Sequence, residues 1–293
     1  MSKAADGPGF ALGVLSRTWS RVEAGDVDAV HRSRVATRRL REALPVVKGR
    51  GRERRRLRRE LRRVTRSLGP IRELDVALSL AGTLAIDWPD LASALDQVTG
   101  RLHELRARRR ARLIRKVSRA DIENLVERVE ALLAQARRPN ALRPSIDRPR
   151  LAERIASRAA TTRDTAERAG ALYAPEALHA ARIATKKLRY ALEVARAVRI
   201  VGAASAVRRL KQYQDLLGLL HDLQVFSSHV TRLQTRHAVD EPDMATLSDL
   251  LMHLEDRCRE LHAAFVAQRG ALVTLCDDVE GVFARLGAAT RSS

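Results

Sequence analysis

The chain has 293 residues and a formal net charge of +20 at pH 7, with 45% hydrophobic but only 3% aromatic residues. Few Gly and Pro residues and abundant Ala, Leu, Arg and Glu are typical of an all-α protein with long helices. Two cysteines are too few for a disulfide framework, and no apolar run approaches the roughly 20 residues that span a bilayer. We therefore expect a cytoplasmic protein without a signal peptide and without a membrane partner.

Signals for helix starts and stops divide the first half of the chain into amphipathic segments. Asp26 is the expected N-cap of the first segment, and Gly69-Pro70 is expected to end the second. The predicted helices cover residues 30–47, 53–67, 71–84, 90–117 and 121–138.

The second half repeats this layout after a proline-rich segment, residues 139–150, which is the predicted linker. Its predicted helices cover residues 151–172, 175–201, 204–217, 219–236, 244–268 and 271–286. The sequence thus predicts two four-helix-bundle-like subdomains, an N-terminal one over residues 10–138 and a C-terminal one over residues 151–287.

The two halves share two sequence segments. Residues 30–44 read VHRSRVATRRLREAL and residues 178–192 read LHAARIATKKLRYAL, an offset of 148 residues. Residues 68–76 read LGPIRELDV and residues 217–225 read LGLLHDLQV, an offset of 149. Two matches at nearly one offset indicate duplication of a domain-sized unit.

The positive charge is concentrated in the duplicated segments. Residues 31–66 hold 16 Lys and Arg against 3 Asp and Glu, and residues 179–211 hold 9 against 1. The other 224 residues together carry a net charge of −1. A general Arg-rich composition would not confine the charge in this way, so the pattern points to a polyanionic partner.

The cations of each copy share one helix face. At about 100° per residue, the first ladder (Arg34, Arg38, Arg41) lies on the His31 side, opposite the apolar stripe. The second ladder (Arg182, Lys186, Arg189) lies likewise on the His179 side. Stacked like charges destabilise an isolated helix, and we expect no compensating carboxylate except Glu42 on the flank. An external anion is therefore predicted, the alternative being a solvated basic face whose aliphatic stems shield the bundle.

On these motifs the chain resembles the CHAD family, the conserved histidine α-helical domain, from about residue 10 to residue 287. The resemblance implies two bundles related by pseudo-twofold symmetry, a shared basic groove or central pore, and binding of inorganic polyphosphate. The residues that it implies as phosphate ligands are His31, Arg34, Arg38, Arg39, Arg41, His179, Arg182, Lys186, Lys187 and Arg189. A second rank on the following helices comprises Arg59, Arg62, Arg63, Arg208, Arg209 and Lys211.

The composition agrees with polyphosphate, because a polymer without bases needs cations but no aromatic stacking platforms. Single-stranded nucleic acid usually needs such platforms, whereas binding to a duplex backbone needs only Lys and Arg and stays an alternative. Another alternative is an accessory or regulatory module for an enzyme that processes polyphosphate or triphosphate.

No catalytic residue, metal ligand or cofactor is predicted. The chain has no phosphate-binding Gly-rich loop and no zinc-protease helix motif. His221 and Asp222 are adjacent on a helix and so diverge by about 100°, which makes a poor acid–base pair. Their role is left open, although Asp75, Asp222 and Gln224 are expected to cap or bridge helices. The expected function is therefore non-catalytic: sensing of polyphosphate or targeting to polyphosphate granules.

Overall fold

A computed structural model describes residues 8–48, 51–137, 145–235 and 241–289, and these form an all-α fold. The α-helices of the described residues are α1 (Pro8–Ala24), α2 (Val27–Ala43), α3 (Gly51–Asp87), α4 (Ala92–Lys116), α5 (Arg119–Gln135), α6 (Arg148–Arg168), α7 (Pro175–Ala197), α8 (Ala203–Gln234) and α9 (Glu241–Ala289). Short 3₁₀ turns follow α2 (Leu44–Val46) and α3 (Pro89–Leu91).

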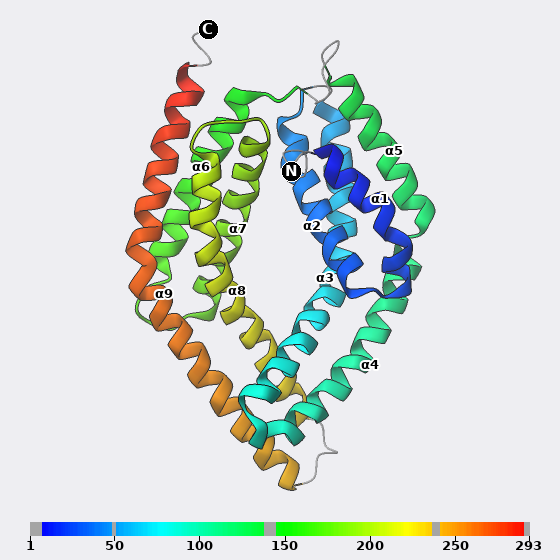
Figure 1. Ribbon diagram of the computed structural model, residues 1–293, viewed down its shortest axis with the longest axis vertical. Coiled ribbons are helices and arrows are strands. Elements are labelled where there is room, and N and C mark those ends of the chain that lie inside the picture. Colours follow the sequence, from blue (N-terminus) through cyan, green and yellow to red (C-terminus); the bar gives the residue numbers. More distant parts are fainter. Residues whose placement is uncertain (1–7, 49–50, 138–144, 236–240, 290–293) are drawn as a thin grey trace.

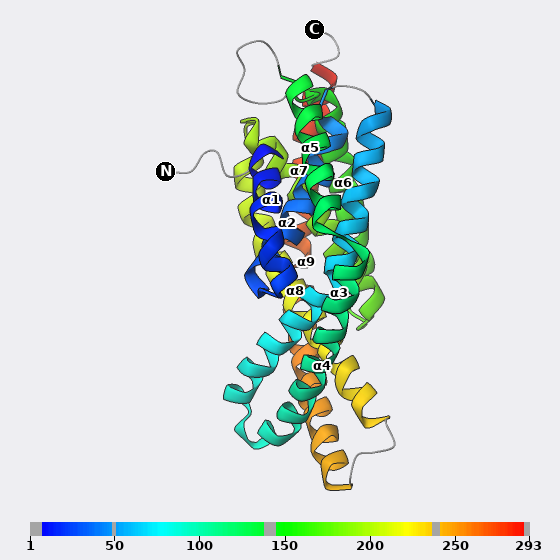
Figure 2. The same cartoon turned by 90° about the vertical axis from the view of Figure 1, so that its right-hand side faces the viewer.

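The helices form an elongated molecule that is forked at one end (Figure 1). One arm contains α1, α2, α5 and the first part of α3, and the other contains α6, α7, the first part of α8 and the last part of α9 (Figure 1). At the opposite end α3, α4, α8 and α9 come together (Figures 1 and 2). The helices at the centre, α2 and α7, contact each other, and these are the helices that carry the duplicated histidine segments.

Two clusters of buried apolar side chains hold this arrangement. The first joins α1, α2, α5 and the beginning of α3, and includes the fully buried Trp19 and Leu40. The second joins α6 to α9, and also takes in Leu74 of α3 and Leu102 of α4. The last part of α3 and the first part of α4 therefore pack with the C-terminal arm, although they precede the linker in sequence.

The predicted helix start at Asp26 is confirmed, because its Oδ1 accepts a hydrogen bond from the Ala29 N–H at 2.7 Å. The predicted break at Gly69-Pro70 is wrong: α3 continues through it. Proline removes one backbone hydrogen bond from a helix interior, but α3 is fixed on both sides. Leu68 is buried in the first apolar cluster and Leu74 in the second, so packing outweighs the local preference.

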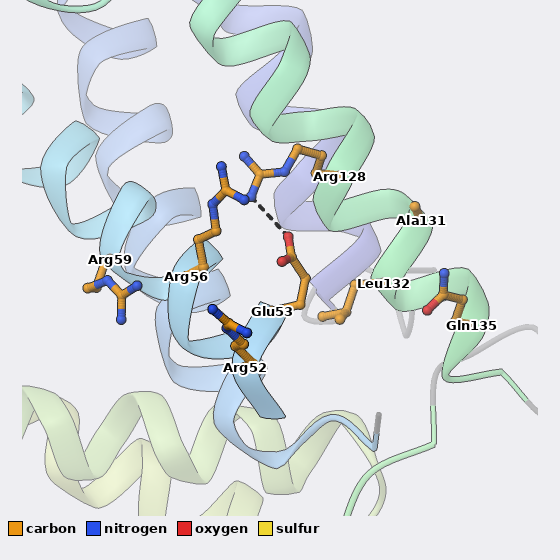
Figure 3. A pocket seen from close by; sticks show the side chains of 8 residues that line it. All are labelled: Arg52, Glu53, Arg56, Arg59, Arg128, Ala131, Leu132 and Gln135. Atoms are coloured by element: carbon orange, nitrogen blue, oxygen red, sulfur yellow. Dashed lines mark hydrogen bonds and ion pairs between the residues drawn. The ribbon is translucent and has the colours of Figure 1, made fainter. Parts of the chain in front are cut away.

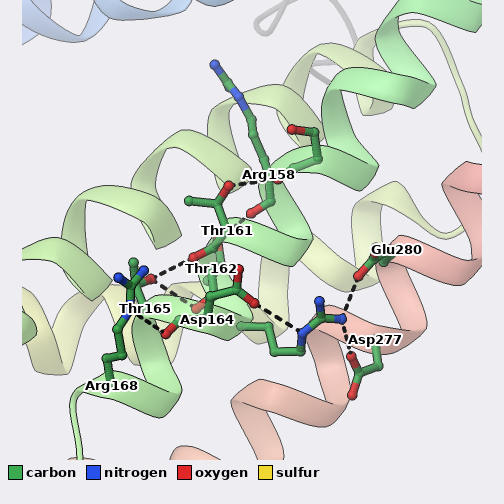
Figure 4. Close-up of polar contacts among 10 residues, drawn as sticks. Arg158, Thr161, Thr162, Asp164, Thr165, Arg168, Asp277 and Glu280 are labelled. Carbon is green, nitrogen blue, oxygen red and sulfur yellow. Dashed lines mark hydrogen bonds and ion pairs between the residues drawn. The ribbon is translucent and has the colours of Figure 1, made fainter.

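The predicted breaks at residues 217–219 and 268–271 are also wrong, because α8 and α9 run through them. A glycine inside a helix costs only about 1 kcal/mol, and both long helices are packed along their length. Helix α9 is further tied to α6 by Arg163, whose Nη1 lies 3.0 Å from Asp277 and 2.7 Å from Glu280 (Figure 4). Residues 139–144 of the predicted linker lie outside the described residues, and its last residues belong to α6, which begins at Arg148.

Candidate anion-binding cleft

The two arms enclose a basic cavity of about 420 Å³ between α2, α3, α7 and α8. A smaller cavity of about 190 Å³ adjoins it and shares Arg38, Lys186 and Tyr190 with it. We call these two cavities together the cleft. Its charged and imidazole lining residues are His31, Arg34, Arg38, Arg39, Arg41, Glu42, Arg72, Glu73, Arg182, Lys186, Lys187, Arg189, His221 and Asp222.

The amphipathic pattern explains why the two ladders meet there. In α2 the apolar side, with Ala36 and Leu40, is buried in the first cluster. In α7 Ala184 and Leu188 are buried in the same way. Because each helix buries its apolar side in its own arm, the opposite sides face each other where α2 and α7 contact. All six ladder cations therefore line one cleft rather than two separate surfaces.

Arg34 is held by the backbone of α3. Its Nη1 donates to the Thr65 carbonyl at 3.2 Å, and a Cβ placed on Gly69 would lie only 2.9 Å from the same nitrogen. Gly69 therefore provides the space that the Arg34 guanidinium occupies. Burial, together with the neighbouring Arg38, lowers the pKa of Arg34 to about 10.

Lys186 is the most strongly perturbed cation of the cleft. Burial lowers its pKa to about 7, and the nearby Arg182 and Arg38 add to this effect. The ammonium group is thus near half-protonation at neutral pH in the ligand-free protein. An anion placed in the cleft would favour the charged form.

Carboxylates balance part of this charge, so the expectation that Glu42 alone could do so is wrong. Glu193 of α7 is 3% exposed and pairs with Arg39 of α2 at 3.1 Å and with Arg189 at 2.8 Å. Asp222 lies 3.7 Å from Arg182. The pairing of Glu193 with Arg39, 154 positions away, is not visible in the sequence, but the spacing of four residues from Arg189 was a signal for Glu193 that the sequence analysis did not use.

Glu42 lines the smaller cavity of the cleft but also contacts the other arm. Its side chain pairs with Arg154, at 2.9 Å, and with Arg158, both on α6. It therefore joins α2 to the other arm, and its charge also partly offsets the lowering of the pKa of Arg41 by burial.

His31 and His221 line the cleft, whereas His179 contacts His221 without being among the lining residues. Burial lowers the pKa of His31, and Arg72 contributes to the shift. His179 Nδ1 lies 3.3 Å from His221 Nδ1, and burial followed by Arg182 lowers the pKa of His221 to about 3. Burial also lowers the pKa of His179, so this pair is neutral at pH 7.

The two copies differ at this point. Arg72 and His221 occupy corresponding positions in the second repeated segment, and both line the cleft. The first copy thus places an arginine near its histidine, where the second places another histidine. His221 and Asp222, whose role the sequence left open, both belong to the lining.

The helix-bridging prediction is confirmed for Asp75, whereas Gln224 contacts Tyr173 in the segment between α6 and α7 and so does not bridge two helices. Asp75 of α3 accepts a hydrogen bond from Arg106 of α4 at 2.6 Å. Gln224 of α8 donates to the Tyr173 hydroxyl at 2.8 Å. Asp222 faces Arg182 on the neighbouring α7.

The second rank of predicted ligands does not gather in the cleft. Arg59 lines a separate cavity of about 590 Å³ between α3 and α5 (Figure 3). Arg62 is close enough to Arg41 to lower its pKa, after the larger effect of burial, whereas Arg63 lies near Asp121 of α5. Arg209 lies 3.7 Å from Asp278 of α9, and Arg208 and Lys211 are exposed on α8. Helical rotation spreads these residues over several faces.

The molecule is thus an all-α protein in which two copies of a basic helix line one cleft. A family model for the CHAD domain matches residues 10–231, and the chain belongs to this family. A comparison with curated proteins returns no match.

Two solved structures share the fold. The crystal structure of the CHAD domain from the plant Ricinus communis has a TM-score of 0.56 at 20% identity, covering 94% of this chain and 88% of the plant chain. PptA from Streptomyces chartreusis has a TM-score of 0.53 at 16% identity, covering 93% and 96% respectively. Among the described residues, no helix is long and apolar enough to cross a membrane, and no three His, Cys, Asp or Glu side chains are grouped to hold a metal ion.

Proposed function

We propose that the cleft binds inorganic polyphosphate and that the protein acts by binding, without catalysis. The observation that carries the proposal is the convergence of both ladders on one cleft. The lining holds more Arg and Lys side chains than Asp and Glu side chains. The cleft therefore carries a net positive charge, which attracts the oxygens of an anion.

The recessed position of the cations favours a thin, flexible polymer over duplex DNA. The side chains of Arg182 and Arg189 are only 12% and 19% exposed. Phosphates on a rigid duplex need cations that project from the surface. A phosphate chain can enter the cleft and pass between the two ladders.

Binding without catalysis fits a role in sensing polyphosphate or in targeting to polyphosphate granules in the cytoplasm. Two buried free cysteines, Cys258 and Cys276, are compatible with a reducing compartment. Enzymes that make or degrade polyphosphate are the protein partners that this role suggests. Nucleic acid is the competing ligand.

Titration calorimetry at about 0.15 M salt tests the proposal, with long-chain polyphosphate, tripolyphosphate and duplex DNA at equal phosphate concentration. Long-chain polyphosphate is expected to bind at least tenfold more tightly than the duplex, and log K should fall linearly with log salt. Equal affinity for polymer and duplex would make nucleic acid the better candidate. The matched control replaces three exposed arginines outside the cleft, Arg108, Arg257 and Arg259, with alanine. This variant removes as many charges as a ladder variant and should leave the affinity within about twofold.

A further inference from the structure

Glu193 occupies an unusual place beneath the cleft, at the contact between α2 and α7. It carries one of the few buried carboxylates of the described residues. One of its oxygens contacts Arg39 of one arm, and the other contacts Arg189 of the other arm. Both arginines line the larger cavity of the cleft, so Glu193 bridges two of the groups that face a ligand.

We propose that Glu193 is an internal counter-anion that limits the affinity of the cleft for polyphosphate. This inference rests on the proposed function. In the empty protein the carboxylate neutralises part of the charge on Arg39 and Arg189. When a phosphate chain enters, the same two guanidinium groups serve both the carboxylate and the phosphate oxygens. Glu193 thus acts through the two arginines and does not contact the ligand itself.

The charge effect outweighs the orienting effect for this class of ligand. A flexible polymer with one charge per unit can shift to meet cations in many positions, so exact orientation of two arginines matters little. A fixed negative charge behind those arginines repels every phosphate that enters the cleft. Removal of the negative charge therefore tightens binding, although it breaks two buried ion pairs and destabilises the ligand-free protein.

Glu193→Gln removes the charge and keeps a side chain of the same size with an acceptor oxygen. Long-chain polyphosphate is expected to bind this variant about tenfold more tightly at 0.15 M salt. Its plot of log K against log salt should steepen by about 0.7, equivalent to one more phosphate contact. Glu193→Asp retains the charge and should keep the wild-type salt slope. A steeper slope in both variants, or weaker binding by Glu193→Gln, would overturn the proposal.

The matched control is Asp75→Asn. Asp75 is 4% exposed and pairs with Arg106, so this variant also loses a buried ion pair. Neither residue lines the cleft, so Asp75→Asn should lower the melting temperature without changing the affinity or the salt slope. Equal increases in affinity for both variants would attribute the effect to general loosening of the fold and overturn the proposal.

A double-mutant cycle keeps the test valid if Glu193→Gln alone does not fold. Arg39→Gln removes one ligand-facing charge and should weaken binding about tenfold. Glu193→Gln/Arg39→Gln restores the wild-type net charge and should recover most of that loss, because Arg189 is then no longer neutralised. No recovery would assign Glu193 a purely structural role. Failure of the wild-type protein to bind polyphosphate would refute the proposed function instead, which the calorimetry above establishes separately.

Discussion

Replacing Lys186 with methionine tests whether the buried positive charge of the cleft destabilises the ligand-free protein. Methionine keeps the length and most of the apolar surface of the lysine stem but has no charge. Lys186 lies among Arg182, Arg38 and Arg34, and burial with these neighbours lowers its pKa from 10.5 to about 7. The charged form is therefore disfavoured in the folded protein, and we expect Lys186→Met to stabilise it.

The pKa shift sets the size and the sign of the effect. Between pH 7 and pH 10.5 the unfolded chain binds more protons at this lysine than the folded protein does, so the free energy of unfolding rises with pH in that window. A shift of this size corresponds to an upper limit of about 4 kcal/mol at pH 7, and relaxation with water entry reduces it to roughly 2 kcal/mol. Lys186→Met is expected to exceed the wild type by that amount at pH 7 and to match it near pH 10.5.

Urea unfolding at several pH values, in phosphate-free buffer of low salt, measures the difference. Phosphate must be absent because it would occupy the cleft and stabilise the wild type selectively. Lys211→Met, at an exposed lysine of α8, is the matched control and should leave the stability unchanged within about 0.5 kcal/mol. A variant at position 186 that is less stable than the wild type at pH 7, with the same dependence on pH, would refute the reasoning.

Three further predictions concern ligand binding to the cleft. Alanine substitution of either complete ladder should weaken long-polymer binding at least 100-fold in calorimetry. The variant without both ladders should lose less binding free energy than the sum of the two separate losses, since both ladders hold one ligand. Halved stoichiometry with intact affinity would indicate two independent sites. The lowered pKa values of His31 and His179 leave both imidazoles neutral in the empty protein, and nearby phosphate raises these pKa values. Affinity should therefore increase as pH falls from 8 to 6, and a double alanine variant should show a smaller increase; the same increase in both proteins would assign the histidines to packing. Gly69→Ala should stabilise α3 by about 0.5–1 kcal/mol. The added methyl group should displace the Arg34 guanidinium and weaken polyphosphate binding several-fold. Unchanged binding would mean that Arg34 does not contact the ligand from this position.

The direction in which each ladder faces was predictable because it depends on local periodicity. The apolar residues of α2 and α7 recur at helical spacing, so the opposite side must carry His31 and the cations whatever the tertiary structure. The duplication then implied that the same helix face is charged in both copies. The resemblance to the CHAD family supplied the shared groove, which periodicity alone does not contain.

Features that depend on packing between distant segments were not predictable. Gly69-Pro70 is a strong local stop signal, yet α3 continues because Leu68 and Leu74 are buried in two different clusters. The pairing of Glu193 with Arg39 depends on how α2 crosses α7. The second rank was placed by sequence proximity, but the rotation of α3 puts Arg59 in the cavity toward α5.

Burying several cations in one cleft costs free energy in the ligand-free protein. This cost accounts for the internal carboxylates that partly neutralise the cations. Exposed cations on two separate arms would bind any polyanion and would need no internal carboxylate. Burial brings the two ladders within reach of one thin ligand, but it lowers the pKa of Lys186 and of Arg34 and requires Glu193 where the arms meet. The ligand then reduces the repulsion among the buried cations, because it adds negative charge to the cleft. Such a cleft couples binding to stability, so that polyphosphate should raise the melting temperature most in variants that lack an internal carboxylate.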